Sequence, residues 1–233
     1  MLPPGNTDVD LSELWFQIPI GPHRVSHQHM RSDFRAAADS FWDPAVAPPF
    51  VGNIYQEFQR FPDLGLNLLA AAASQLIERH ESRGPHGALT PDSFLVDRLG
   101  HVSLVDAHGE FAEHAELHRK QDRVFISAAW RYQPTEQLCP DNPEGDPVYD
   151  LKGDVFAFAT IIYELFGGQL PRGRRALYQR IEGTRPLHMT RPRLLSNDHL
   201  WYLLTKSWSQ DPEQRPSVKE IEDALLSTLE SNT

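Results

Sequence analysis

The strongest constraint on the fold is a long apolar run in the second half of the chain. Residues 154–168 read DVFAFATIIYELFGG, and their apolar side chains fall on nearly every face of a helix with about 3.6 residues per turn. A helix that is apolar all round is stable only where other elements cover it on every side. The run therefore predicts a buried central helix.

Three further segments have the periodicity of helices. Residues 64–84 place apolar side chains at helical spacing and end on Gly84, where a C-cap glycine belongs. Residues 197–208 and 217–230 are amphipathic, and Pro216 directly precedes the second of them. The chain from residue 112 onward is expected to be mainly helical.

Strands are expected in the first half. Residues 50–58 read FVGNIYQEF, a plausible strand, and two short apolar strands, 94–96 and 102–105, flank a turn at 97–100. Residues 1–50 are rich in proline and loops, with a possible strand and a short helix at the ranges 13–20 and 30–42. The chain is predicted to divide into an N-terminal segment, 1–50, and a main domain, 51–230.

Composition excludes several classes of protein. The net charge is −10, whereas nucleic acids and anionic membrane surfaces select basic clusters. No apolar run approaches the roughly 20 residues of a membrane helix, and the N-terminus lacks the features of a signal peptide. The single cysteine, Cys139, fits a reducing compartment. A cytoplasmic or nuclear protein with no nucleic-acid or membrane partner is expected.

Five motifs in fixed order resemble those of the C-terminal lobe of protein kinases, most closely the tyrosine-kinase-like and tyrosine kinase branches. They read HGALTPDSFLVD, GHVSLVDAHG, WRYQPTE, DVFAFATIIYELFGGQLP and SWSQDPEQRPSVKEI. The resemblance covers residues 54–229 and implies an α+β, mainly helical fold with a truncated or remodelled N-terminal lobe. It also places IYQEF, residues 54–58, at the hinge between lobes.

The resemblance also shows which catalytic groups are replaced. The loop opens on His86, but Ala88 stands where the family has the aspartate that orients the acceptor hydroxyl. Thr90 replaces the lysine that contacts phosphate, and Ser93 replaces the asparagine that binds the second metal ion. Only Asp106 keeps the residue type of a metal-binding position.

The N-terminal side lacks the other phosphate-binding parts of a kinase. Residues 1–85 contain no G-x-G-x-x-G sequence, and the first lysine of the chain is Lys120. These replacements predict a pseudokinase that needs no cofactor. Binding of ATP and magnesium at Asp106 stays a minor possibility.

Some retained residues have structural roles in the family. The resemblance implies a buried ion pair between Glu136 and Arg215, which ties the activation segment to the helical subdomain. It also implies that Asp154 accepts hydrogen bonds from the backbone around His86. Each of these residues could alternatively be an ordinary surface charge.

Two histidine-containing clusters lack the convergent partners that a metal site needs, so no metal site is predicted. They are His23, His27 and His29, and Glu110, His114 and His118. The basic sequences QLPRGRRALYQR and RPRLLSNDHL are either a solvated face or a docking site.

Two classes of function stay open. The first is a scaffold or allosteric regulator that binds a protein partner, such as a kinase, another signalling protein or a second copy of this chain. The second is a divergent ATP-dependent protein kinase, in which Asp92 or Asp106 acts as the base and an arginine binds phosphate.

Overall fold

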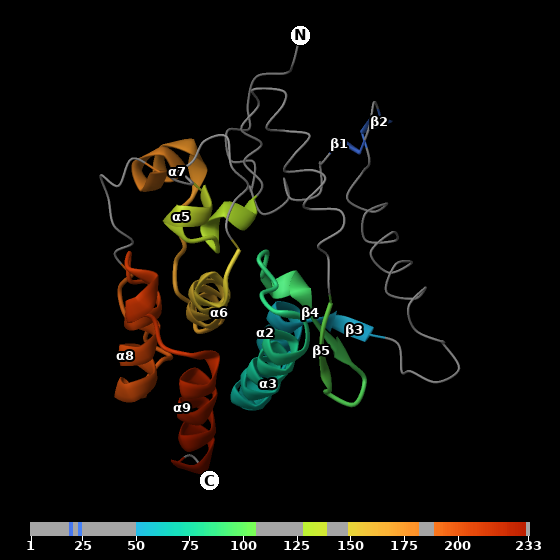
Figure 1. Ribbon diagram of the computed structural model, residues 1–233. Helices are drawn as coiled ribbons and strands as arrows, with labels where there is room; N and C mark the ends of the chain where they lie inside the picture. The colour runs from blue at the N-terminus through green and yellow to red at the C-terminus, as the bar shows by residue number, and fades with distance from the viewer. Residues whose placement is uncertain are drawn as a thin grey trace, which may run out of the picture. The chain divides into compact units, whose positions relative to one another are not determined.

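The computed structural model describes residues 19–20, 23–24, 50–105, 128–138, 149–181 and 189–231. The chain divides into two compact units, Met1–Ala47 with Ile126–Ala128, and Pro48–Phe125 with Ala129–Thr233. In the first unit, the strands β1 (Pro19–Ile20) and β2 (His23–Arg24) form an antiparallel pair (Figure 1). The helix expected at 30–42 lies outside the described residues, and so does most of the strand expected at 13–20.

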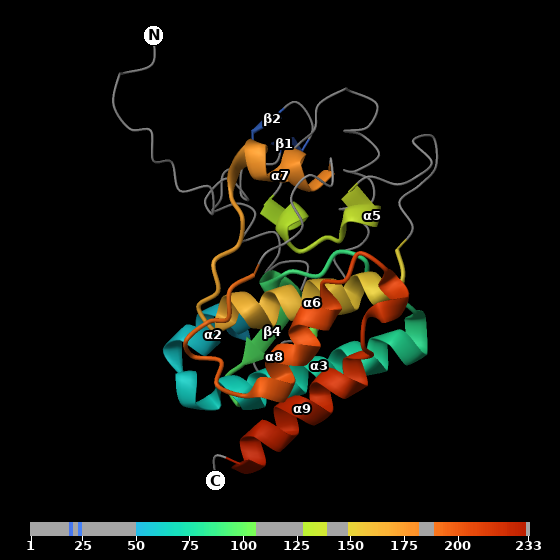
Figure 2. The same cartoon turned by 90° about the vertical axis from the view of Figure 1, so that its left-hand side faces the viewer.

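Helix α6 (Leu151–Leu165) is the buried centre of the second unit, as the apolar run predicts. The side chain of Asp150 caps its N-terminus by accepting a 2.6 Å hydrogen bond from the Gly153 amide. Phe158, Ile161 and Ile162 are fully buried. Figure 2 shows the helix running across the middle of the unit, and α2 and α8 contact it directly.

Three long helices surround this core. Helix α3 (Gly65–Arg83) ends at Gly84, whose positive φ of 81° is one that glycine adopts without strain. Helices α8 (Asp198–Ser207) and α9 (Val218–Ser231) are amphipathic, and α9 packs against both α3 and α8. The predicted helices at 64–84, 197–208 and 217–230 are therefore confirmed, with ends shifted by one residue or so.

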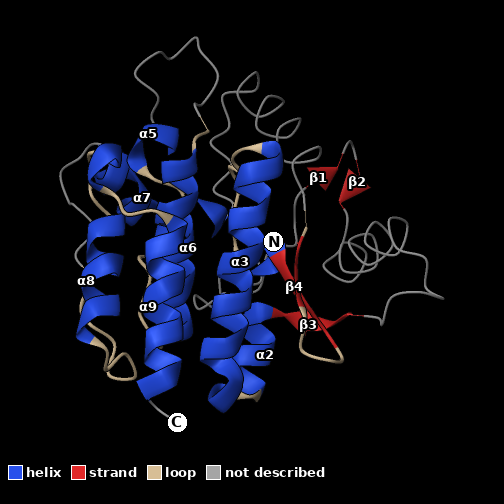
Figure 3. Cartoon of the chain, turned by 60° about the horizontal axis from the view of Figure 1, so that its bottom comes forward, coloured by secondary structure: helices blue, strands red, loops and turns tan. Residues whose placement is uncertain are grey.

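A three-stranded antiparallel sheet packs beside α3, with the order β3-β4-β5 (Figure 3). Its strands are β3 (Phe50–Asn53), β4 (Phe94–Asp97) and β5 (Val102–Leu104). Opposite residues in the second pair include Phe94 with Leu104 and Val96 with Val102. The turn between these strands contains Gly100 at a φ of 84°, so the predicted hairpin is confirmed.

The expectation that residues 50–58 form one strand is wrong. The strand ends at Asn53, and IYQEF lies in helix α2 (Ile54–Arg60). The physical reason is a capping box, in which Asn53 accepts from the Gln56 amide and the Gln56 side chain accepts from the Asn53 amide. Ile54 and Phe58 then face the interior at helical spacing.

Shorter elements complete the described part of the second unit. They are η2 (Pro62–Leu64), η3 (Pro91–Ser93), η4 (Ala128–Arg131), α5 (Thr135–Leu138), α7 (Gly173–Ile181) and η5 (Pro212–Gln214). The mainly helical α+β class is thus confirmed. None of the described helices combines the length and the apolar character that crossing a membrane requires.

Candidate functional site

The loop that begins at His86 is fixed by a single buried carboxylate. Asp154, in the first turn of α6, is 1% exposed and accepts a 2.5 Å hydrogen bond from the His86 amide and a 2.7 Å bond from the Gly87 amide. The structure therefore places Asp154 against the backbone around His86, as the resemblance implies.

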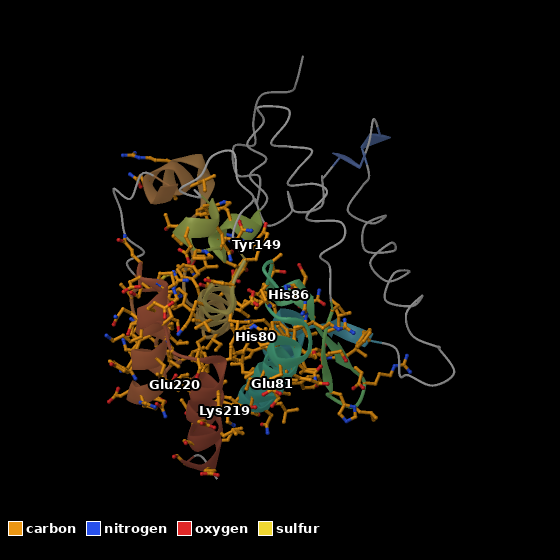
Figure 4. All side chains as sticks on the ribbon, viewed as in Figure 1. His80, Glu81, His86, Tyr149, Lys219 and Glu220 are labelled. Carbon is orange, nitrogen blue, oxygen red and sulfur yellow. The ribbon has the colours of Figure 1, made fainter. Side chains whose placement is uncertain are left out.

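A third group on this carboxylate is His80 of α3, which sequence reasoning did not assign to the site. Its Nε2 lies 2.9 Å from Asp154 Oδ2. Figure 4 shows His80 and His86 beside α6. The available signal was the helical spacing of Leu69, Leu76 and His80, which puts this polar side chain on the face that packs inward.

His86 is a neutral, structural histidine. The side chain is fully buried, and its Nδ1 accepts a hydrogen bond of 3.3 Å from the Ala88 amide. Its Nε2 must then carry the proton, which it donates to the Val105 carbonyl at 3.0 Å. Both ring nitrogens thus hold the loop in shape against the end of β5.

The degenerate positions of the loop are occupied by small side chains that bond to the loop itself. Ala88 presents only a methyl group. The Ser93 hydroxyl accepts a 3.1 Å hydrogen bond from the Thr90 amide, and both residues are buried. These contacts close the turn η3 without offering a charge to a ligand.

Asp92 is the one carboxylate at the centre of this loop, and it is tied to the neighbouring helix. Asn53 donates from its amide nitrogen to Asp92 Oδ1, while the Asn53 amide oxygen caps α2. Sequence reasoning missed the role of Asn53, although the spacing of Asn53 and Gln56 is a capping-box signal. The pair links the end of β3 to the loop.

The described donor set does not fit a magnesium nucleotide. Magnesium in nucleotide sites is held by carboxylate and other oxygen ligands at near-octahedral geometry, and a lysine usually contacts the phosphates. Here Ala88 supplies no carboxylate, Thr90 supplies no positive charge, and the Ser93 hydroxyl already accepts one hydrogen bond from the Thr90 amide. Asp106 lies outside the described residues.

Elsewhere in the described ranges, no cluster of three or more His, Cys, Asp or Glu side chains could hold a metal ion. The histidine-containing clusters singled out in the sequence lie outside those ranges, apart from His23.

Glu136 and Arg215 form a direct ion pair, with 2.6 Å between Glu136 Oε1 and Arg215 Nη1. The Arg215 side chain is only 1% exposed, but Glu136 is 34% exposed, so the pair is buried on one side rather than on both. Arg215 also donates to the carbonyls of Ser209 and Lys152, at 3.0 and 3.1 Å. Its guanidinium lies 5.3 Å from the ring centre of Phe156 in α6.

A second polar contact joins the turn that follows η4 to the end of α6. The Tyr132 hydroxyl donates a 2.5 Å hydrogen bond to Glu164 Oε2. Burial raises the pKa of Tyr132 well above its usual value of 10, and the neighbouring Glu164 carboxylate adds to the effect. The phenol is therefore a neutral donor that ties these two elements together.

Comparisons with known proteins agree with the motifs. The sequence model of a family described as protein tyrosine and serine/threonine kinase matches residues 70–225. Serine/threonine-protein kinase 12 of Arabidopsis thaliana is 28% identical over 158 residues, which are 64% of this chain and 32% of that protein. Dual specificity protein kinase pyk3 of Dictyostelium discoideum is 33% identical over 153 residues, or 61% of this chain and 10% of that protein.

A third relative, mitogen-activated protein kinase kinase kinase 7 of Mus musculus, is 29% identical over 143 residues, or 58% of this chain and 22% of that protein. This chain spans about a third or less of the length of these relatives. The family match covers well over half of the 233 residues and includes the central helix and the loop that it anchors. The chain therefore belongs to the protein tyrosine and serine/threonine kinase family.

Proposed function

We propose that this chain is a pseudokinase, a member of the family that has lost phosphotransfer and acts by binding other proteins. It would serve as a scaffold or as an allosteric regulator, and its partner would be another kinase or a signalling protein. The observation that carries the proposal is Ala88, a methyl group where the family places the carboxylate that orients the acceptor hydroxyl.

Several catalytic groups are missing together, so any remaining phosphoryl transfer should be very slow. Phosphoryl transfer depends on positioning and on neutralising charge, and a single missing group commonly costs a factor of about 10²–10³ in rate. Ala88, Thr90 and Ser93 each replace a working group, and no lysine precedes Lys120. The contributions of catalytic groups that act together are not additive, so restoring one group alone recovers little activity.

The contacts that stabilise the fold are kept, which supports a function in binding other proteins rather than in catalysis. Asp154 still anchors the loop through two backbone amides, and Arg215 still joins Glu136 to the helical part. A chain that keeps such contacts after losing the reacting groups retains a defined shape. Binding needs that shape and does not need the chemistry.

We expect no detectable phosphotransfer from the purified full chain. Incorporation of ³²P from labelled ATP into a generic protein substrate and into the chain itself measures this directly. Ala88→Asp alone should remain inactive, because the phosphate-binding groups would still be missing. A catalytically active relative serves as the positive control. Incorporation that rises above background and disappears in Asp106→Ala would contradict the proposal.

The alternative function is a divergent protein kinase that uses Asp92 or Asp106 as the base. The hydrogen bond from Asn53 favours a structural role for Asp92, because it draws that carboxylate toward the start of α2. A divergent kinase must still bind ATP, so nucleotide binding separates the two functions.

We expect millimolar MgATP to leave the melting temperature unchanged within about 1 °C. A ligand present at 100 times its Kd would stabilise the fold by about 2.7 kcal/mol. In a domain of this size, that corresponds to a rise of roughly 5–10 °C. Differential scanning fluorimetry with ATP, with and without magnesium, makes the measurement. A rise of several degrees that is lost in Asp106→Ala would favour the divergent kinase.

A further inference from the structure

Helix α2 is too short to be stable by itself. It has seven residues, whereas isolated helices shorter than about 12–15 residues are marginal in water. Its inward side rests on Ile54 and Phe58, which are buried. The Phe58 ring meets the ring of Phe166, at the end of α6, edge to face at 5.6 Å between centroids. Packing and capping therefore decide whether residues 54–60 are helical.

A buried carboxylate in the same helix opposes these contacts. Glu57 is 6% exposed, and within the described residues its carboxylate accepts no hydrogen bond. Its ion pair with Arg60 has 3.9 Å between Oε1 and Nη1, beyond hydrogen-bonding distance, and the Arg60 side chain is 64% exposed. Burying a carboxylate without hydrogen-bonded partners is unfavourable. The helical state of α2 therefore depends strongly on the contacts that remain.

The N-terminus of α2 is fixed by Asn53, which uses both ends of its side-chain amide. The amide oxygen accepts from the Gln56 backbone at 2.8 Å, and the amide nitrogen donates to Asp92 Oδ1. Because the amide group is planar, one side-chain orientation sets both contacts. The cap of α2 and its contact with the loop should therefore form and break together.

The other end of this contact lies in the loop that begins at His86. Asp92 is part of η3, where the Ser93 amide donates to the Thr90 carbonyl at 3.0 Å and the Thr90 amide donates to the Ser93 hydroxyl at 3.1 Å. Helix α2 contacts both η3 and β4, and Figure 1 shows it beside these strands. A change in α2 is thus felt directly by the loop.

From these observations we propose that Asn53 couples the conformation of α2 to that of the loop at residues 86–93. Loss of its bond to Asp92 lets α2 open and loosens η3. Opening uncovers Ile54 and Phe58, so a partner bound at the loop changes the surface that α2 presents, and the reverse. The inference goes beyond the pseudokinase proposal, because this coupling would serve an active kinase equally well.

The first test breaks the contact from the loop side. In the full chain, Asp92→Ala should accelerate amide hydrogen exchange at Gln56 and Phe61 by at least about tenfold, because α2 loses a hydrogen bond to a charged group. Gln56 reports the capped end, and the Phe61 amide, which donates to the Glu57 carbonyl at 2.8 Å, reports the other end. Amides of α6 should change less, because their exchange reports global unfolding.

The second test breaks the same contact from the helix side. Asn53→Ser keeps a good N-cap oxygen but has no NH₂ group to donate to Asp92. Exchange at Thr90 and Ser93 should accelerate by a similar factor, because a coupling free energy is reciprocal. The matched control is Asp63→Ala, which removes an exposed carboxylate directly after α2 and should leave exchange at all these amides unchanged.

Three results would overturn the proposal. The first is unchanged exchange at both ends of α2 in Asp92→Ala. The second is faster exchange at Gln56 alone, since Asn53 would then be an ordinary cap that acts on one turn. The third is an equal acceleration in Asp63→Ala, which would indicate a general effect of charge. If Asp92→Ala does not fold, Asn53→Ser decides alone, and unchanged exchange in the loop would overturn the coupling.

Discussion

Arg215→Ala should lower the free energy of unfolding by about 2–5 kcal/mol, because it removes a buried side chain and leaves the acceptors that it bonds without a donor. The Arg215 guanidinium is buried, and it donates to the carbonyls of Ser209 and Lys152 as well as to Glu136. Its removal leaves these acceptors without their donor and opens a cavity beside Phe156. Urea unfolding followed by circular dichroism measures the change.

Because Glu136 is 34% exposed, the two residues of the ion pair should contribute unequally to stability. Glu136→Gln should cost less than Arg215→Ala, because the guanidinium keeps its two carbonyl acceptors and the site of Glu136 is open to water. Arg193→Ala is the matched control, and an exposed arginine of this kind should change stability by about 0.5 kcal/mol or less. Equal small effects at Arg215 and Arg193 would contradict a stabilising role for the buried Arg215 side chain.

The parts of the fold that sequence predicts best are those with a continuous local pattern. The run at 154–168 is apolar on every face, and no exposed helix could tolerate that pattern. Helix α3 combines apolar spacing with Gly84 at a positive φ, two signals that agree on where the helix ends. The hairpin β4–β5 was predicted because its strands and its glycine-containing turn are all local.

The error at α2 arose because two local signals compete in residues 50–58. The apolar and aromatic residues of this run favour one strand, yet Asn53 and Gln56 have the spacing of a capping box, and Ile54 and Phe58 have the spacing of a helix. A cap satisfies backbone donors that an extended segment would leave to water. The capping box and the spacing of Ile54 and Phe58 together predict the helix.

The candidate site was predictable only in part, because its contacts join residues far apart in sequence. His80 and Asp154 are separated by 74 positions, and Glu136 and Arg215 by 79. Family motifs placed the second pair and the amides on Asp154, since those contacts belong to the motifs themselves. His80 lies outside the five motifs, and helical spacing shows that it faces inward without showing which group it meets.

Asp154→Ala should be as damaging as the loss of Arg215, by a different mechanism. The His86 and Gly87 amides would remain buried without their acceptor, and each unsatisfied group costs about 1–3 kcal/mol. For the two amides together, the expected loss of unfolding free energy is about 2–6 kcal/mol. Hydrogen exchange of the same two amides should also accelerate, because the loop would no longer be held against α6.

A variant of the neighbouring Asp150 distinguishes the loss of the loop contacts from the loss of a helix cap. Asp150→Ala removes the side chain that caps the same helix and should cost about 1 kcal/mol. Among the described residues, this side chain bonds to the Gly153 amide alone. The loss of stability in Asp154→Asn should lie between those of Asp154→Ala and Asp150→Ala. The side-chain oxygen of the asparagine can still accept from one backbone amide, but its NH₂ group is a donor and cannot accept from the other. If Asp154→Ala were no more destabilising than Asp150→Ala, and left exchange at His86 and Gly87 unchanged, then Asp154 would not be what holds this loop in place.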